Sequence, residues 1–298
     1  MKHLSWTLLL IAATLTACSS DDDTEPQNPA ATTTQVVPQP ETRLMYVDVS
    51  ESPLTDEAEA RQEGTTRAVE TTTSSLSKFF MNYTDAYPYT FEKENDKWGT
   101  NEWPNVDNNA KIDFYAYTGG TFNYSSDPYV SFTVEENAST QHDLLVAEHK
   151  NISKNDASGH VSLHFSHACA AVNFRIGQSS TLKSKSVIFT SIAITGIYNH
   201  GEYHYNTTPK WKDITGNATY TLELASSIEI PVSKKEENEG ARVLDCGYLF
   251  MIPQAHNVTI TIGYTLGTAK TANITLPVDW QAGKKYTVDI RLGTNTIN

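Results

Sequence analysis

Cysteine is scarce in this chain, which has Cys18, Cys169 and Cys246 among 298 residues. So few cysteines exclude a fold held together by a disulfide framework, because such scaffolds are small and dense in cysteine. Cys169 and Cys246 can pair in an oxidising compartment. Each also lies in an apolar, strand-like run where a free cysteine behaves as a small hydrophobic residue. We favour the unpaired state.

Basic residues are also few. The chain has 22 Lys and Arg against 35 Asp and Glu, and its formal net charge is −13 at pH 7. Proteins that bind nucleic acid, or that dock on anionic lipid, need a basic surface to meet the phosphates. The charge balance therefore argues against nucleic acid as a partner and against electrostatic binding to lipid headgroups.

Motifs of enzymes and cofactor sites are missing from the sequence. It contains no G-x-S-x-G turn, no P-loop and no H-E-x-x-H. His164, His167 and Cys169 lie close together in sequence, but on a strand His164 faces away from the other two. A zinc site needs three or four converging ligands. We therefore expect no enzyme activity, no catalytic residue, no metal site and no cofactor.

The chain begins with a short basic start and an apolar segment, Leu4 to Leu15, which is too short to span a membrane and has the length of a signal-peptide core. Leu15-Thr16-Ala17-Cys18 then resembles a bacterial lipobox. Residues 1–17 are predicted to be a signal peptide, and Cys18 is predicted to carry a diacylglycerol and a further acyl chain such as palmitate. Several acyl chains make a stable anchor. The alternative is an ordinary secretory leader with a chance cysteine.

Residues 18–42 are predicted to form a lipidated, acidic, flexible tether, because they are rich in Asp, Thr, Pro and Gln. The run Asp21-Asp22-Asp23 resembles the surface-export signal of Bacteroidales-type lipoproteins. That resemblance implies a surface-exposed lipoprotein of the cell outer membrane. A solvated linker without such a signal is the alternative explanation.

Beyond residue 43 the dominant hydrophobic period is two, which predicts strands with one buried face. Alternation is clearest at Val258 to Leu266, Ile274 to Trp280 and Tyr286 to Leu292. Many short strands separated by turn residues indicate an all-β fold of β-sandwiches. Ser74 to Phe80 is the one segment where a helical turn or two is expected. In Val161 to Ile176 the alternation changes phase, so a β-bulge is expected near residues 168–169.

Six stretches, in order, resemble the Bacteroidales fimbrillin family, which comprises the type V pilins and fimbrillin-like proteins. They are Trp103-Pro104 with Lys111 to Tyr117, Asp143 to Ala147, Val161 to Ile176, Ile192 to Tyr198 with Trp211, Met251 to Gln254, and Trp280 to Tyr286. The resemblance covers roughly residues 65–292. It implies two β-sandwich domains of transthyretin-like topology, here placed at 43–157 and 158–298.

The resemblance also implies a route of assembly. In these pilins an arginine-specific protease removes an N-terminal strand, and the opened groove accepts a β-strand from a neighbouring subunit. Here residues 43–67 are the candidate removable strand and loop, and Met45, Val47 and Val49 form the apolar face of this plug strand. Residues 51–66 are expected to be an exposed loop.

Two arginines are candidates for the processing site. The junction of Arg67 and Ala68 resembles the family's cleavage site more closely, and Arg61 is the alternative. The last strand is expected to end near Leu292, which leaves little chain to donate to a neighbour. The sequence therefore predicts a tip or accessory subunit of a fimbrium rather than a stalk subunit, with other fimbrial subunits as partners through strand addition.

A different class of function stays open. A monomeric, surface-exposed lipoprotein that binds glycans would use exposed aromatic rings such as Tyr87, Tyr89, Trp98 and Trp103. The same rings also suit packing in a core. A host or bacterial surface receptor is a further possible partner under either interpretation.

Overall fold

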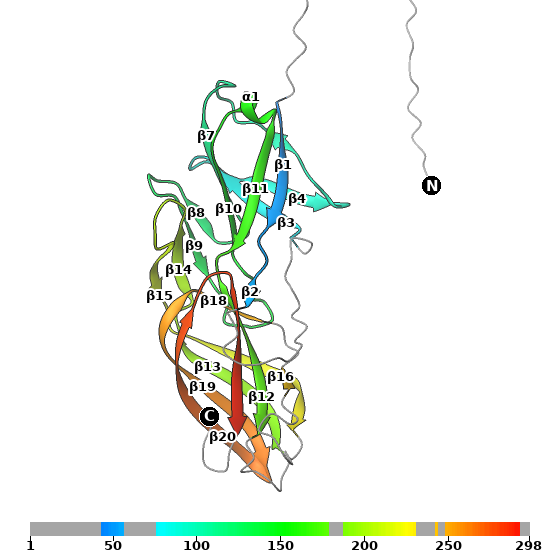
Figure 1. Ribbon diagram of the computed structural model, residues 1–298, viewed down its shortest axis with the longest axis vertical. Helices are drawn as coiled ribbons and strands as arrows, with labels where there is room; N and C mark the ends of the chain where they lie inside the picture. Colours follow the sequence, from blue (N-terminus) through cyan, green and yellow to red (C-terminus); the bar gives the residue numbers. More distant parts are fainter. Residues whose placement is uncertain (1–42, 57–75, 179–186, 231–241, 244–247, 293–298) are drawn as a thin grey trace, which may run out of the picture. The chain divides into compact units, whose positions relative to one another are not determined.

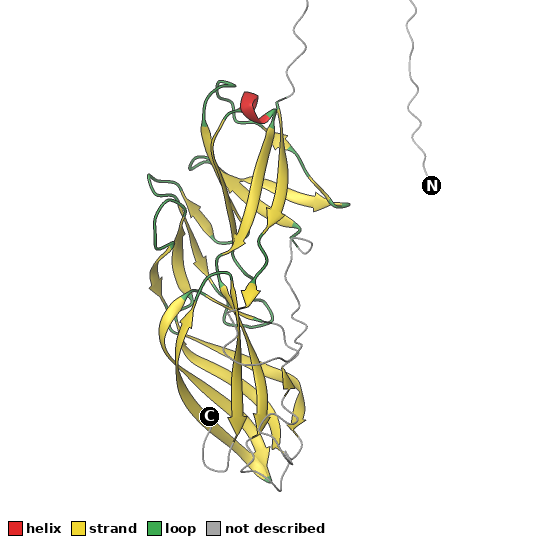
Figure 2. Ribbon diagram, in the orientation of Figure 1, coloured by secondary structure: helices red, strands yellow, loops and turns green. Residues whose placement is uncertain are grey.

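The computed structural model describes residues 43–56, 76–178, 187–230, 242–243 and 248–292. Strands dominate these residues, and the helix among them, α1 (Lys154–Ala157), is a single turn (Figure 2). In this part of the chain no helix is long and apolar enough to cross a membrane. The all-β class expected from the period-two pattern is confirmed.

The largest sheet of the described residues has eight strands (Figure 1). In spatial order they are β5 (Lys97–Trp98), β4 (Tyr89–Glu94), β3 (Lys78–Asn82), β7 (Ile112–Tyr117), β10 (Leu145–Ile152), β11 (His160–His167), β1 (Leu44–Glu51) and β6 (Asn101–Glu102). Segments far apart in sequence lie side by side here, since β1 pairs in parallel with β11. The other neighbouring strands of this sheet run antiparallel.

Three further sheets are built mainly from the second half of the chain. The first contains β17 (Arg242–Val243), β12 (Ala170–Gln178), β21 (Lys284–Leu292) and β2 (Thr55–Asp56), with β18 (Leu249–Met251) also paired to β12. The second contains β16 (Ala218–Ile230), β13 (Val187–Ile197), β19 (Gln254–Leu266) and β20 (Thr268–Trp280). The third contains β15 (Trp211–Thr215), β14 (His200–His204), β9 (Tyr129–Thr133) and β8 (Thr121–Asn123).

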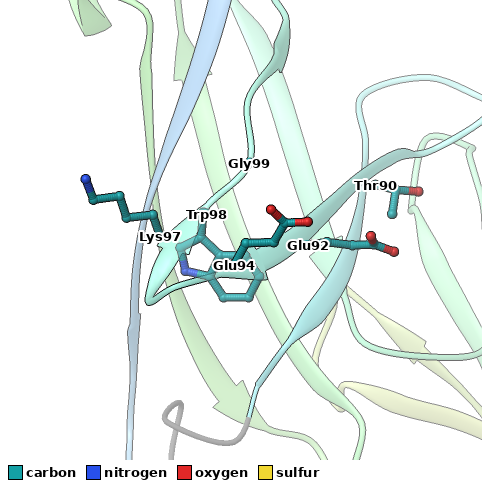
Figure 3. A pocket seen from close by; sticks show the side chains of 6 residues that line it. All are labelled: Thr90, Glu92, Glu94, Lys97, Trp98 and Gly99. Atoms are coloured by element: carbon teal, nitrogen blue, oxygen red, sulfur yellow. The ribbon is translucent and has the colours of Figure 1, made fainter. Parts of the chain in front are cut away.

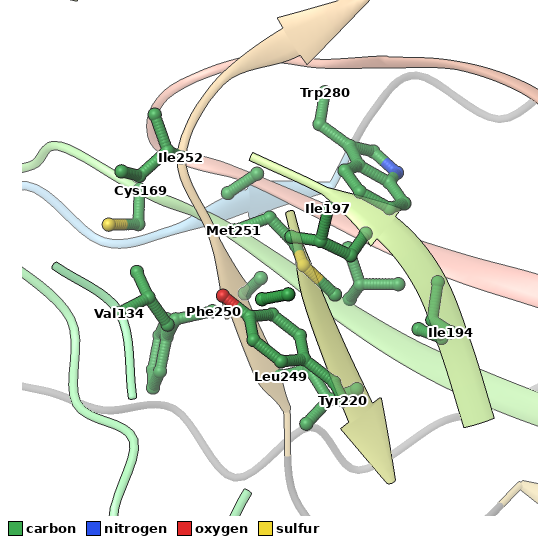
Figure 4. Packing of buried hydrophobic residues seen from close by; sticks show 14 of the residues in the cluster. Val134, Cys169, Ile194, Ile197, Tyr220, Leu249, Phe250, Met251, Ile252 and Trp280 are labelled. Atoms are coloured by element: carbon green, nitrogen blue, oxygen red, sulfur yellow. The ribbon is translucent and has the colours of Figure 1, made fainter. Parts of the chain in front are cut away.

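Two hydrophobic clusters form the core of the described residues. One lies against the eight-stranded sheet and includes Phe79 and Phe91, whose rings stack with centroids 5.0 Å apart. The other is assembled mainly from the remaining sheets, and Figure 4 shows Tyr220, Met251 and Trp280 packed within it. Strand β7 is buried on both faces and supplies side chains to both clusters.

The chain passes from one cluster to the other just after β11. Phe165 belongs to the first cluster, and Ala168 belongs to the second. The expected bulge at residues 168–169 is therefore wrong: β11 ends at His167, β12 begins at Ala170, and the two strands lie in different sheets. The change of phase in the sequence marks this change of sheet. The division into domains at residues 157 and 158 stays a prediction.

Candidate functional site

Strand β1, the segment expected to be removable, lies in the eight-stranded sheet. Its register with β11 runs from Tyr46 opposite His160 to Glu51 opposite Phe165. On its other side it pairs with β6 only through Leu44 and Met45. Backbone hydrogen bonds to β11 therefore hold most of the length of β1.

The inward face of β1 is apolar over three alternate positions. Met45 is fully buried, Val47 is nearly so, and Val49 is half-buried against the same cluster. These are the three residues expected to form the apolar face of the plug strand. Strand geometry explains the pattern, because successive side chains point to opposite faces of a sheet. Each buried aliphatic side chain contributes about 1.5–3 kcal/mol to holding the strand.

The fourth inward position of β1 is an acid. Glu51 Oε1 lies 2.9 Å from Nε2 of His167, and the two side chains are only 4% and 1% exposed. The other ring nitrogen of His167, Nδ1, lies 2.5 Å from Oδ2 of Asp143. Asp143 Oδ1 also accepts a hydrogen bond of 3.1 Å from the backbone N–H of Cys169. A buried imidazole therefore stands between two buried carboxylates from different parts of the chain.

The protonation of these groups is shifted by burial and by their mutual charge. Burial raises the pKa of Asp143, although the hydrogen bond and charge of His167 oppose it. Burial also raises the pKa of Glu51 against the opposing charge of His167. Burial alone would lower the pKa of His167, but Asp143 and Glu51 outweigh it and raise that pKa. The cluster therefore binds protons more tightly than the same groups in water.

The segment after β1 continues into the second hydrophobic cluster. Leu54 is buried there, and β2 adds in parallel to β21 through Thr55 opposite Lys284. The backbone N–H of Thr55 also donates to the carbonyl of Gly283 at 3.0 Å. Residues 44–56 thus complete one strand position in each of two sheets. The expectation of an exposed loop from residue 51 is wrong at Glu51 and Leu54, because both have partners in the folded cores.

Several residues singled out in the sequence lie outside the described part of the chain. They are the lipidation candidate Cys18, the processing candidates Arg61, Arg67 and Ala68, and Cys246. Their assignments stay predictions. Cys169 is described and carries a free, buried thiol, whose pKa is raised by burial.

His164 and His167 take separate environments, as their opposite parity on the strand predicts. The exposed His164 contacts the hydroxyls of Ser50 and Ser52 at 2.9 and 2.6 Å. His167 belongs to the buried cluster with Glu51 and Asp143. In the described residues no group of three or more His, Cys, Asp or Glu has the arrangement of a metal site.

Of the four aromatic residues considered for glycan binding, three are buried or partly buried and one is exposed. Trp103 is buried, while Tyr89 and Trp98 are partly buried and pack on the first cluster. Tyr87 is fully exposed. It lines a cavity of about 420 Å³ together with Asn82, Asp85, Ala86, Pro88, Tyr117, Gly120, Thr121 and Phe122.

A second cavity, of about 580 Å³, lies over the outer face of β4 (Figure 3). Its lining residues are Thr90, Glu92, Glu94, Lys97, Trp98 and Gly99. Glu92 is paired with Lys78 at 3.1 Å. The ring of Trp98 packs edge-on against Phe79 with centroids 4.9 Å apart, so it serves the core as well as the cavity.

Comparison with known proteins decides the family. A profile described as fimbrillin-like matches residues 58–298. The chain belongs to the fimbrillin-like family. The family suggested by the six sequence stretches is thereby confirmed, and membership supports a fimbrial or cell-adhesion role at the cell surface. The match begins shortly after β2, so β1 and β2 lie outside the matched region.

Solved structures show the same fold at low identity. A fimbrial protein from Bacteroides vulgatus is 17% identical, with a TM-score of 0.52 over 86% of this chain and 96% of that chain. A protein assigned to cell adhesion from Parabacteroides distasonis is 10% identical, with a TM-score of 0.51 over 87% of this chain and 90% of that chain. No curated protein sequence matches the chain.

Sequence reasoning missed the cluster of Glu51, Asp143 and His167. Glu51 stands in a polar stretch before a proline, which is typical of a loop. One signal was available, because Glu51 continues the odd-numbered parity of Met45, Val47 and Val49. His167 likewise continues the parity of Leu163 and Phe165 on β11.

Proposed function

We propose that this protein is a fimbrial subunit or adhesin that is exported as a lipoprotein and assembled by strand exchange. A protease cuts the chain after β2, residues 44–56 leave, and a strand from another subunit takes their place. The role is structural. The partner is recognised by main-chain pairing, which gives affinity, and by side chains in alternate pockets, which give specificity.

One observation carries the proposal: residues 44–56 complete two sheets and fill both hydrophobic clusters. Met45 and Val47 enter one cluster, and Leu54 enters the other. The backbone pairs with β11 along β1 and with β21 along β2. An incoming strand can make the same kinds of contact.

The position of this segment in the chain also supports the proposal. The two candidate arginines, Arg61 and Arg67, follow the end of β2 by 5 and 11 residues and precede β3. A cut at either one would separate residues 44–56 from the rest of the chain. The region that matches the fimbrillin-like family, 58–298, does not include β1 or β2.

The chemistry of the opened site favours a β-strand as the replacement. Loss of β1 would leave unpaired backbone groups along β11, and loss of β2 would do the same along β21. The spaces left by Met45, Val47 and Leu54 would expose apolar surface to water. A new strand with alternate apolar side chains repairs both defects at once.

We also propose how the precursor reaches the cell surface and where the mature subunit lies in the fibre. Acylation of Cys18 would anchor the precursor in the outer membrane, and cleavage after Arg67 would free the mature subunit from that anchor. We place the subunit at the tip or in an accessory position. Immunogold labelling is expected to mark fibre ends or sparse sites, and continuous labelling along the shaft would overturn this placement.

Replacing both candidate arginines tests the mechanism. The double variant Arg61→Ala with Arg67→Ala is expected to keep residues 44–56 and to remain monomeric on native gels. Arg43→Ala, which changes an arginine before β1, is the matched control and is expected to assemble normally. Assembly of the double variant at the wild-type level would overturn proteolytic triggering.

A monomeric glycan-binding lipoprotein is the second candidate. The observation in its favour is the cavity of about 420 Å³ that carries the fully exposed ring of Tyr87 and the carboxylate of Asp85. Glycan binding on an array that is lost in Tyr87→Ala, together with an intact acylated N-terminus, would favour this function over assembly.

A further inference from the structure

The inward faces of β1 and β11 share an unusual order of side chains. Both begin with apolar residues at alternate positions, and each ends in an ionisable residue: Glu51 on β1 and His167 on β11. Both ionisable side chains are buried. A strand that merely filled an apolar groove would carry an apolar residue at this fourth position.

The contact of Glu51 is electrostatic rather than a well-formed hydrogen bond. Its Oε1 lies 2.9 Å from His167 Nε2. Neither carboxylate oxygen of Glu51, nor His167 Nε2, has a partner with hydrogen-bond geometry among the described residues. Removing either partner would leave the other buried without its counter-charge, which is costly in a protein interior.

The three members of the cluster would separate on strand exchange. Glu51 belongs to the segment that leaves, whereas Asp143 and His167 stay with the remaining subunit. Asp143 keeps its 2.5 Å contact to His167 Nδ1, but the Nε2 side of the ring loses its carboxylate. The proposed function therefore creates a polar end, the Nε2 side of the His167 ring, in an otherwise apolar groove.

Resting on the proposed function, we propose that His167 selects the incoming strand. The strand that replaces β1 must carry a carboxylate at the position of Glu51, after apolar residues at the positions of Met45, Val47 and Val49. An apolar residue there would leave His167 Nε2 buried without the carboxylate that now lies 2.9 Å from it. A Lys or Arg would place a cation where the folded chain has the carboxylate of Glu51.

The same two strands supply a matched control. Asp48 of β1 lies 3.1 Å from His160 Nδ1 of β11, so this is also a pair of a carboxylate and a histidine. Its side chains are 61% and 49% exposed, so solvent screens the pair. Asp48 should therefore contribute little to strand selection, although its chemistry resembles that of Glu51.

A peptide exchange experiment tests the proposal. The full chain, carrying Cys18→Ser, is cut with an arginine-specific protease and exposed to labelled peptides of residues 43–56. Affinity is measured for the native peptide and for its Glu51→Leu, Glu51→Gln and Asp48→Leu forms. The same peptides are tested on chains carrying His167→Leu or His167→Gln, and His167→Gln serves if His167→Leu does not fold.

The native peptide is expected to bind about ten- to a hundredfold more tightly than its Glu51→Leu form. Asp48→Leu should change the affinity less than about threefold. The His167 variants should lose the preference for Glu51. Equal binding of the native peptide and its Glu51→Leu form to the native chain would overturn selection by His167 and leave strand exchange standing. Failure of every peptide to bind would overturn strand exchange, and this inference with it.

Discussion

The buried cluster at the end of β1, formed by Glu51, Asp143 and His167, has a net charge that depends on pH. Their raised pKa values mean that the folded state binds more protons than the unfolded state over the range in which they titrate. The neighbouring thiol of Cys169 stays protonated, because burial raises its pKa as well. The stability supplied by the cluster should therefore fall as pH rises, opposite to ordinary acid unfolding.

The predicted pH dependence follows from the direction of each shift. The contribution of His167 is complete below its unfolded pKa of 6.5 and is lost as pH rises through the higher folded value. The contributions of Glu51 and Asp143 are lost in the same direction, from 4.5 and 3.8 upward. Urea unfolding of wild type and of the triple variant Glu51→Gln, Asp143→Asn and His167→Gln from pH 6 to 9 measures the effect. Wild type should lose more stability across this range than the variant.

His160, the exposed histidine on the strand that also carries His167, provides the control. His160→Gln should keep the pH dependence of wild type, because its pair with Asp48 is exposed to solvent. A triple variant with the slope of wild type would contradict the proposed titration of the cluster.

The cluster also shows why single residues were hard to assign from sequence. Parity along β1 was visible in the sequence, and it placed Met45, Val47 and Val49 on one face, which is the inward face of the strand. The same parity at Glu51 did not predict burial, because acidic side chains are usually exposed. Its partner His167 is 116 positions away, a distance that no local pattern bridges.

Strands were predicted best where alternation was long. Val258 to Leu266 and Tyr286 to Leu292 lie within β19 and β21. The helical turns expected at Ser74 to Phe80 are wrong from Lys78 onward, where β3 begins. Phe79 and Met81 are both fully buried there, so sheet packing decides the conformation.

Two glycines in turns allow the cost of a strained backbone conformation to be measured separately from the cost of steric crowding. Gly120 has φ of 82°, and a Cβ there would lie 2.5 Å from the carbonyl oxygen of Ser131. Gly267 has φ of 74°, but a Cβ there would meet nothing within 4 Å. Gly267→Ala should cost about 1 kcal/mol, and Gly120→Ala at least about 2 kcal/mol, by thermal or urea unfolding. Equal costs would show that crowding at Gly120 is relieved by movement of β9.

For the protein as a whole, the family could be recognised from sequence because six stretches occurred in order. The pairing of residues 44–56 with two sheets could not be predicted from the sequence, because β2 is only two residues long and Leu54 is a lone apolar residue beside a proline. Its role depends on Gly283 and Lys284, more than 220 positions away. Strand partners this distant emerge only from the folded chain.

Lipidation is predicted to act before assembly. Cys18→Ser should abolish acylation and reduce the amount of subunit at the cell surface, measured by surface proteolysis and by labelling with a fatty-acid analogue. Cys169→Ser, a change at a buried thiol, is the control and should still be acylated. Normal surface display of an unacylated Cys18→Ser protein would contradict delivery by the lipid.

The N-terminus of the protein in sheared surface fibres tests the central claim most directly. Mass spectrometry of that terminus, with Edman sequencing, would show whether residues 44–56 are still part of the chain. We predict a mature chain that begins at Ala68, or at Gln62 if Arg61 is the processing site. A fibre protein that begins at acylated Cys18 and retains β1 and β2 would contradict strand exchange.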